Sequence, residues 1–289
     1  MRLLPLFIIG LAIPGSAVAQ SLTDSFNYAA GTNLHNLAGS GGIDWKNHNL
    51  SGNNGASVTA SGLSYTDAGY STFISNGRAA EVTSAGAGSV NSAPTLHPSL
   101  LTVDGLRSTF GNVLYGSFLV KATAGQDIAT AIYFDSGFPI GTGNQGFSAG
   151  LYVGSGQYRT MAFNESNGSY NDLPTGKTTA IGQTDLVVFR YEQRASTNEQ
   201  IFSVAINPVF TGSGITWDQT SIGLKGPSNF RTEFWSYHYG SNPPGTVIYD
   251  EVKFGATLES VTPVPEPTTM AALSLGLVAL YSRRKTAKR

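Results

Sequence analysis

Residues 185–193 read DLVVFRYEQ and residues 200–206 read QIFSVAI, and these two runs decide the fold class. Each run has the length of a strand and is rich in β-branched and aromatic residues, which favour extended backbone. The connection between the two runs is polar and short, as in a hairpin. Together they predict a pair of antiparallel strands.

Runs of the same kind recur between clusters of Gly, Asn, Ser and Pro. No stretch between them combines a helical period with caps, and many short strands without intervening helices indicate an all-β, antiparallel, two-sheet sandwich. The Gly-, Ser- and Asn-rich part between residues 24 and 90 is expected to form edge strands and long loops. The further strands are predicted at Val113–Ala122, Ile128–Asp135, Phe147–Val153, Thr232–Tyr239 and Thr246–Phe254.

Composition excludes several classes of protein. The chain has 289 residues, of which 40% are hydrophobic and 12% charged, with a net charge of −1. Disorder throughout is excluded because it requires low hydrophobicity and high net charge. The chain has no cysteine, which removes disulfides, thiolate nucleophiles and cysteine-bound metals. Basic residues gather at the C-terminus, so the body lacks the basic stripe that nucleic-acid binding requires.

The N-terminus has the parts of a secretory signal peptide. Arg2 precedes the apolar run Leu3–Ile13, and the small residues Ala17 and Ala19 precede Gln20. A buried core helix is the alternative, but two prolines in this segment would break it. We therefore expect export, with signal peptidase cutting after Ala19 and residues 1–19 forming the signal peptide.

The C-terminus has three parts in order: a Pro-Glu-Pro motif, an apolar stretch of 12 residues and a basic end. The apolar stretch is shorter than the roughly 20 residues of a relaxed membrane span. A helix docked on the body is the alternative, but the stretch is apolar all round, which suits lipid better. The basic end would stay in the cytoplasm. The parts are Pro265-Glu266-Pro267, Met270–Tyr281 and a cluster that starts with Arg283 and Arg284.

These three parts resemble the PEP-CTERM sorting signal of exported bacterial proteins, which would occupy residues 263–289. The resemblance implies a temporary transmembrane anchor that an exosortase-type membrane protease removes near the Pro-Glu-Pro motif. It also implies a Gram-negative bacterium and a final location at the cell surface or in the extracellular matrix. It does not imply what the body does, because the signal is attached to many unrelated domains.

The body, residues 20–262, resembles the concanavalin A-like jelly roll of laminin G, lectin and glucanase domains. The resemblance rests on Asp24–Tyr28 at the mature start, on the strand Val188–Glu192 and on Tyr249–Gly255 at the end. It implies that the first and last strands pair, which closes the domain and leaves the tail beside the start.

Two enzyme-like patterns lack the structural context that they need. Gly146–Gly150 matches a nucleophile elbow around Ser148, and Gly141–Gly146 matches a dinucleotide loop, but no predicted helix follows either pattern. Adjacent Asp250 and Glu251 would point to opposite faces of a strand, so they cannot be the paired carboxyls of a glycosidase. We expect them to be a surface carboxylate and a hydrogen-bonding group at a strand end. No catalytic residue is predicted.

No cofactor is predicted either, since the chain has no calcium-loop pattern. Loop carboxylates at Asp135, Asp172 and Asp218 could hold a structural calcium ion together if the fold brought them close. The sequence does not decide that question.

The stretch Arg231–Tyr239 contains the candidate ligand site. Strand alternation places Glu233, Trp235, Tyr237 and Tyr239 on one face. Flat aromatic faces beside a carboxylate suit the C–H faces and hydroxyls of a sugar. The alternative is that these residues pack in the core, which the composition favours because most of the 11% aromatic residues must lie inside.

The sequence thus favours a non-catalytic, exported β-sandwich that acts in the extracellular matrix and binds polysaccharide. One alternative is a hydrolase or lyase that acts on polysaccharide through an unrecognised site, and another is a purely structural surface protein. Clustered carboxylates about 5–9 Å apart on a concave face would favour the enzyme. An exposed aromatic strip without them would favour binding.

We predict that the exported protein begins at Gln20, because the small residues Ala17 and Ala19 fit the signal-peptidase pattern. Intact-mass and N-terminal peptide analysis of the exported material checks this. Exported material that still carries Met1 would contradict it.

Overall fold

The computed structural model describes 17 segments of the chain, and the account below concerns these residues. They are 21–32, 34, 37–38, 44–47, 56–66, 73–74, 77–83, 94–96, 113–122, 127–135, 147–154, 156–164, 166–194, 196–210, 214–224, 229–237 and 246–262.

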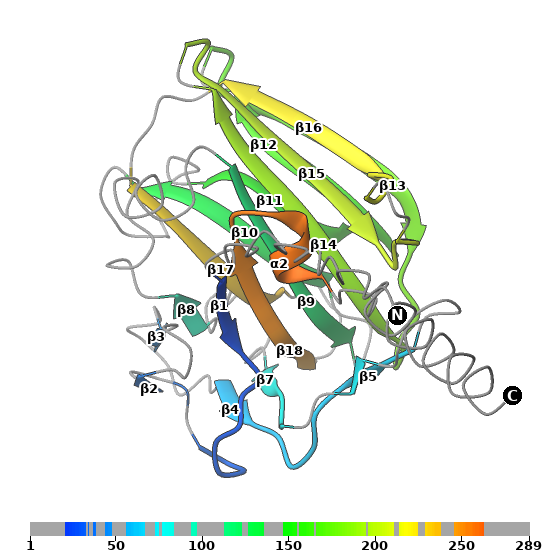
Figure 1. The fold of residues 1–289 in the computed structure, drawn as a ribbon. Coiled ribbons are helices and arrows are strands. Elements are labelled where there is room, and N and C mark those ends of the chain that lie inside the picture. Colours follow the sequence, from blue (N-terminus) through cyan, green and yellow to red (C-terminus); the bar gives the residue numbers. More distant parts are fainter. Residues whose placement is uncertain are drawn as a thin grey trace, which may run out of the picture.

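Sixteen strands form one hydrogen-bonded network, fourteen of them along a single path and two paired beside it. The network folds back into two layers, which a parallel bridge between Asn164 and Leu224 joins (Figure 1). Sheet I contains β16 (Gln219–Leu224), β15 (Glu199–Ile206), β14 (Thr184–Arg194), β9 (Val113–Ala122), β18 (Thr246–Gly255), β7 (Ala80–Thr83) and β4 (Ala56–Val58), with β1 (Ser21–Asp24) beside β18. Sheet II contains β13 (Ser169–Thr178), β12 (Gln157–Asn164), β11 (Phe147–Gly154), β10 (Asp127–Asp135), β17 (Asn229–Tyr237), β8 (Pro94–Leu96), β3 (Asp44–Asn47) and β2 (Leu37–Ala38). A separate hairpin pairs β5 (Ser64–Tyr65) with β6 (Phe73–Ile74).

The main core lies between the two sheets, because alternate residues of each strand point to the same face. Stacked rings of Phe189 and Phe202, with centroids 5.7 Å apart, lie at its centre. Gly116 on β9 leaves the space that the Phe189 ring occupies. Sheet I contributes Phe118, Val187, Phe189, Phe202 and Phe254 to the core, and sheet II contributes Ala149, Leu151, Val153 and Tyr158.

The first strand of the body pairs with the last, as the concanavalin-like resemblance implied. β1 runs antiparallel to β18, with Ser21 opposite Gly255 and Asp24 opposite Val252. The buried Asp24 carboxylate then accepts hydrogen bonds from the Phe26 amide and the Tyr28 hydroxyl, both at 2.7 Å. These bonds fix the direction in which the chain leaves β1.

After β18 the chain turns onto the outer face of sheet I and forms a single helical turn, α2 (Leu258–Val261). Thr257 and Ser260 cap this turn reciprocally. The Ser117 hydroxyl of β9 donates a hydrogen bond to the Val261 carbonyl. Leu258 packs in a second apolar cluster on the outer face, with Leu119, Leu186 and Val188. The last described residue, Thr262, therefore lies over sheet I.

The predicted antiparallel two-sheet sandwich is confirmed, and so is the hairpin of β14 and β15. β9 has the predicted bounds, and the other predicted strands are shifted by a few residues at most. Ser148 is the second residue of β11 and has strand after it, so it is not at an elbow. The sequence did not predict β12, β13 and β16.

The expectation of a surface carboxylate is wrong for Asp250, which is fully buried. Its carboxylate accepts hydrogen bonds from the Leu63 and Glu251 amides, both at 2.7 Å. Glu251 has a φ of 48° at the register shift between Asp250 and Lys253. Its carboxylate lies 3.5 Å from the Lys253 ammonium. Both carboxylates thus serve a β-bulge that bends the last strand.

We predict that Gly116→Ala lowers the free energy of unfolding by about 1–3 kcal/mol, because the added methyl group would overlap the Phe189 ring. Thermal denaturation measures the loss. Phe189→Leu is the matched second change, since a smaller side chain relieves the overlap. The double variant should lose less stability than the sum of the single variants, and strict additivity would contradict the proposed contact.

Candidate functional site

Three of the four residues in the candidate ligand site lie at alternate positions of β17. These are Glu233, Trp235 and Tyr237, while Tyr239 lies outside the described residues. β17 pairs with β10 along nine consecutive positions without a register shift. The strand is therefore regular, and the three positions share one face of sheet II.

The hydrogen-bonded register identifies which face this is. Leu151 of β11 lies in the core and pairs with Thr130, which pairs with Phe234 on β17. Residues directly opposite in antiparallel strands share a face of the sheet. Position 234 therefore faces sheet I, and positions 233, 235 and 237 belong to the outer face of sheet II.

Small residues stand next to these positions on the neighbouring strands. Trp235 is opposite Ala129, and Glu233 is opposite Ala131, which is itself opposite Gly150 on β11. Ala129 is itself opposite Tyr152 on β11, so the pairing that starts at Trp235 continues to a larger residue. We call positions 129, 131, 150, 233, 235 and 237 the β17 face.

A salt bridge borders the β17 face on its far side. Residues that are paired directly across successive strands form a row. Arg159 of β12 lies in the row of Trp235, and Asp172 of β13 lies in the row of Glu233. The Arg159 Nε is 2.8 Å from the Asp172 carboxylate. The outer face of sheet II therefore offers fixed charged groups beside an aromatic strand, an arrangement that can hold hydroxyl-rich ligands.

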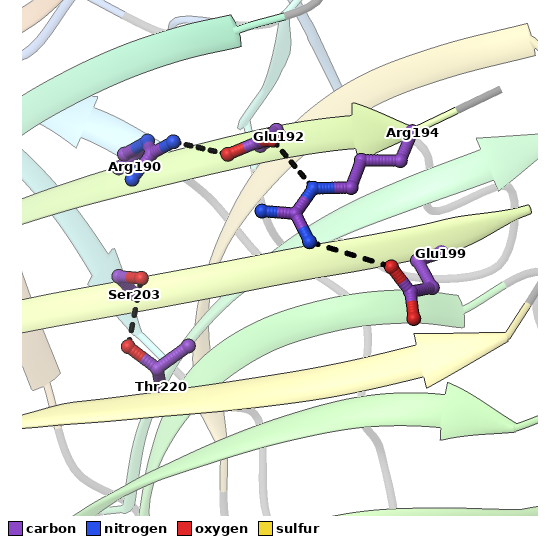
Figure 2. Close-up of polar contacts among 6 residues, drawn as sticks. All are labelled: Arg190, Glu192, Arg194, Glu199, Ser203 and Thr220. Carbon is purple, nitrogen blue, oxygen red and sulfur yellow. Dashed lines mark hydrogen bonds and ion pairs between the residues drawn. The ribbon is translucent and has the colours of Figure 1, made fainter. Parts of the chain in front are cut away.

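The outer face of sheet I carries a charged ladder that the sequence analysis missed (Figure 2). Arg190, Glu192 and Arg194 alternate along β14, and Glu199 follows on β15. Glu192 accepts hydrogen bonds from both arginines, at 2.8 Å from Arg194 Nε, and Arg194 also lies 3.5 Å from Glu199. Ser203 and Thr220 share a hydrogen bond of 2.8 Å in the row of Arg190.

This ladder holds neighbouring strands together. Each of its carboxylates has a guanidinium partner. The hydrogen bond and charge of Glu192 raise the pKa of Arg194, so this guanidinium stays charged. The Arg-x-Glu-x-Arg alternation was a visible signal, but the contact with Glu199 depends on the hairpin register.

A second polar cluster lies between the sheets. The buried Asp185 carboxylate accepts hydrogen bonds from the Tyr158 hydroxyl at 2.9 Å, Gln183 Nε2 at 2.8 Å and Asn207 Nδ2 at 2.7 Å. Desolvation and the nearby Asp185 charge raise the pKa of Tyr158 far above its ordinary value, so the phenol remains a donor. Tyr158 and Asp185 are buried while Gln183 is exposed, so the cluster links the two sheets at the margin of the core.

The carboxylates considered for calcium do not gather. Asp172 is paired with Arg159, whereas Asp218 lies 3.4 Å from Lys177 and accepts a hydrogen bond from the Ile206 amide. Asp135 is the last residue of β10. Within the described segments, no group of three or more His, Asp or Glu side chains could hold a metal ion.

The predicted processing residues lie outside the described segments. They are Ala17, Ala19, Gln20, Pro265, Glu266, Pro267, Arg283 and Arg284. No helix in the described part of the chain is long and apolar enough to cross a membrane.

Comparison with known families identifies the tail. Residues 263–285 match the PEP-CTERM protein-sorting motif. The motif marks an exported protein that is anchored transiently in the membrane, is processed by an exosortase and ends at the cell surface or outside the cell. No curated protein matches the chain in sequence.

Solved structures of similar shape include lectins and polysaccharide lyases. An endo-β-1,4-glucuronan lyase from Trichoderma reesei is 16% identical with a TM-score of 0.47, covering 75% of this chain and 96% of the lyase. Lectin II from Ulex europaeus is 11% identical with a TM-score of 0.43, covering 81% and 97%. An alginate lyase from Pseudomonas aeruginosa is 11% identical with a TM-score of 0.39, covering 74% and 98%. The fold assignment rests on the strand pairing above.

We predict that changing Pro265, Glu266 and Pro267 to alanine leaves the protein in the membrane while export continues, because the exosortase loses its recognition motif. Fractionation and immunoblotting measure the membrane-bound share. A variant with alanine at Thr268 and Thr269 is the matched control and should be released. Normal release of the triple variant would contradict the assigned role of the motif.

Proposed function

We propose that the body is a non-catalytic glycan-binding β-sandwich, which signal peptidase and an exosortase deliver to the envelope or extracellular matrix of a Gram-negative bacterium. Its ligand is extracellular polysaccharide. The binding surface is the β17 face, with Glu233, Trp235 and Tyr237 as the contacting residues.

The observation that carries this proposal is the strand pairing of β11, β10 and β17. Leu151 is opposite Thr130, and Thr130 is opposite Phe234. This pairing puts position 234 in one row with the core residue Leu151, which supports an outer-face location for the two neighbouring aromatic positions. Aromatic residues on an outer sheet face are not needed for the core, and tryptophan and tyrosine are the typical anchors of binding surfaces. The small residues at positions 129, 131 and 150 support the proposal, because a flat ligand beside the rings would meet short side chains there.

The ion pairs of the described carboxylates favour a binding role over catalysis. Glycoside cleavage needs two carboxyls that face one substrate bond, one of them protonated. On the outer face of sheet II, Asp172 is held by Arg159. The ladder carboxylates of sheet I are held by arginines in the same way.

We predict that Trp235→Ala weakens glycan binding on the order of 30-fold, the loss of about 2 kcal/mol that is typical of a central aromatic contact. The melting temperature should change by less than about 2 °C, because an outer-face side chain contributes little to the core. A glycan array on the exported protein identifies a ligand, and titration calorimetry then measures affinity.

Phe234→Ala is the matched control on the same strand. It removes a core-side ring, so we expect a loss of about 3–5 kcal/mol and a drop of roughly 6–20 °C in melting temperature. A drop of ten degrees or more in the Trp235 variant would show a core residue and refute the β17 face. An array without any bound glycan would refute glycan binding itself.

A further inference from the structure

The sorting tail leaves the body from the outer face of sheet I. The Ser117 hydroxyl holds the Val261 carbonyl over β9, and Leu258 packs on Leu119, Leu186 and Val188. Val261 is fully buried, so the attachment is firm up to the end of α2. The sorting motif begins directly after Thr262, at residue 263.

The β17 face belongs to the opposite side of the molecule. Leu151 and Phe189 mark the inner faces of sheets II and I, because both lie in the core between them. The β17 face is on the outer side of sheet II, and α2 is on the outer side of sheet I. The whole sandwich therefore stands between the start of the tail and the proposed glycan site.

The chain between α2 and the apolar stretch is short. Seven residues lie between Thr262 and Met270, and the eight Cα–Cα steps from one to the other reach at most about 29 Å when fully extended. From β9, three strands of sheet I lie on either side, so either edge is about 14 Å away. Passing the second sheet takes about 10 Å more, and the side-chain layers on the two outer faces add roughly 5 Å each, half of a sheet spacing, so the path is about 34 Å. The tether is thus too short to bring the outer face of sheet II flat against the bilayer.

We infer that the anchored precursor stands with sheet I toward the membrane and the β17 face away from it. The precursor therefore binds polysaccharide before the exosortase releases it. The orientation follows from the tail alone, whereas the binding step rests on the proposed function.

The surface turned toward the membrane fits this arrangement. The ladder of Arg190, Glu192, Arg194 and Glu199 has no net charge, and its members neutralise one another. Ser203 and Thr220 add hydroxyls to the same face. Ile222 and Leu224 of β16 are exposed in the rows of Glu192 and Arg194, so the face presents both neutralised polar groups and apolar side chains to the head-group region.

The absence of native cysteine allows a direct test with single cysteines. Arg194→Cys marks the outer face of sheet I and Asp172→Cys marks that of sheet II. The two side chains are 49% and 37% exposed, and the ion pairs that the two changes remove lie at the surface. Both are made in the uncleavable chain with alanines at 265–267, which is reconstituted into phosphatidylethanolamine–phosphatidylglycerol vesicles with an acceptor-labelled lipid.

We predict that energy transfer to the lipid from a dye at position 194 is at least about twice that from position 172, because the two sheets alone separate the dyes by about 10 Å along the sandwich normal. Equal transfer, or stronger transfer from position 172, would overturn the orientation. The same cysteine variants in the cleavable chain, with Pro265-Glu266-Pro267 intact, should show no transfer from either position after exosortase release.

A binding measurement tests the second step. The anchored chain and the released chain should bind the array-selected glycan with affinities within about twofold of each other. Binding by the released chain alone would overturn presentation before release. Binding by neither would refute the proposed function, while the energy-transfer result would still decide the orientation.

Discussion

Hydrogen-bonded register is the constraint on which the rest of this structure depends. Once Leu151 and Val153 of β11 are buried, each directly paired residue on β10 and β12 must face the same way. The constraint passes from β10 to β17 with no shift between them. A slip of one residue anywhere along this path would exchange the inner and outer faces of the strand beyond it.

The alternation that the register enforces separates two kinds of polar chemistry. Polar groups that face inward, such as Asp185 and Tyr158, satisfy each other and join the sheets. Polar groups that face outward on β14 neutralise one another along the strand. The inward groups therefore link the sheets, and the outward groups link neighbouring strands of sheet I.

The sequence predicted the strands that carry their own signal. β9, β14 and β15 are runs of branched and aromatic residues, and local composition was enough to find them. β13 contains Pro174 and many polar residues, and it stands at an edge where pairing with β12 supplies the stability. The bulge at Glu251 could not be predicted, because it depends on the fit between β18 and β9.

For the candidate site too, the local pattern was predictable from the sequence and the long-range pairing was not. Alternation of Glu233, Trp235 and Tyr237 follows from strand periodicity alone, but whether they face the core depends on pairings with distant segments. Composition favoured the core, whereas the register favours the outside. The ladder shows the same limit, since Arg190, Glu192 and Arg194 are near in sequence but Glu199 joins them only across a hairpin.

The pairing of β1 with β18 also has a consequence for the timing of biosynthesis. The ribosome makes Ser21 near the start and its partner Gly255 only when the body is nearly complete. Contacts so distant in sequence form slowly, and until they form the edge of β18 that β1 covers stays open to other strands. The sorting segment is the next part of the chain to be made, so the membrane anchor follows closely on the strand that completes the body.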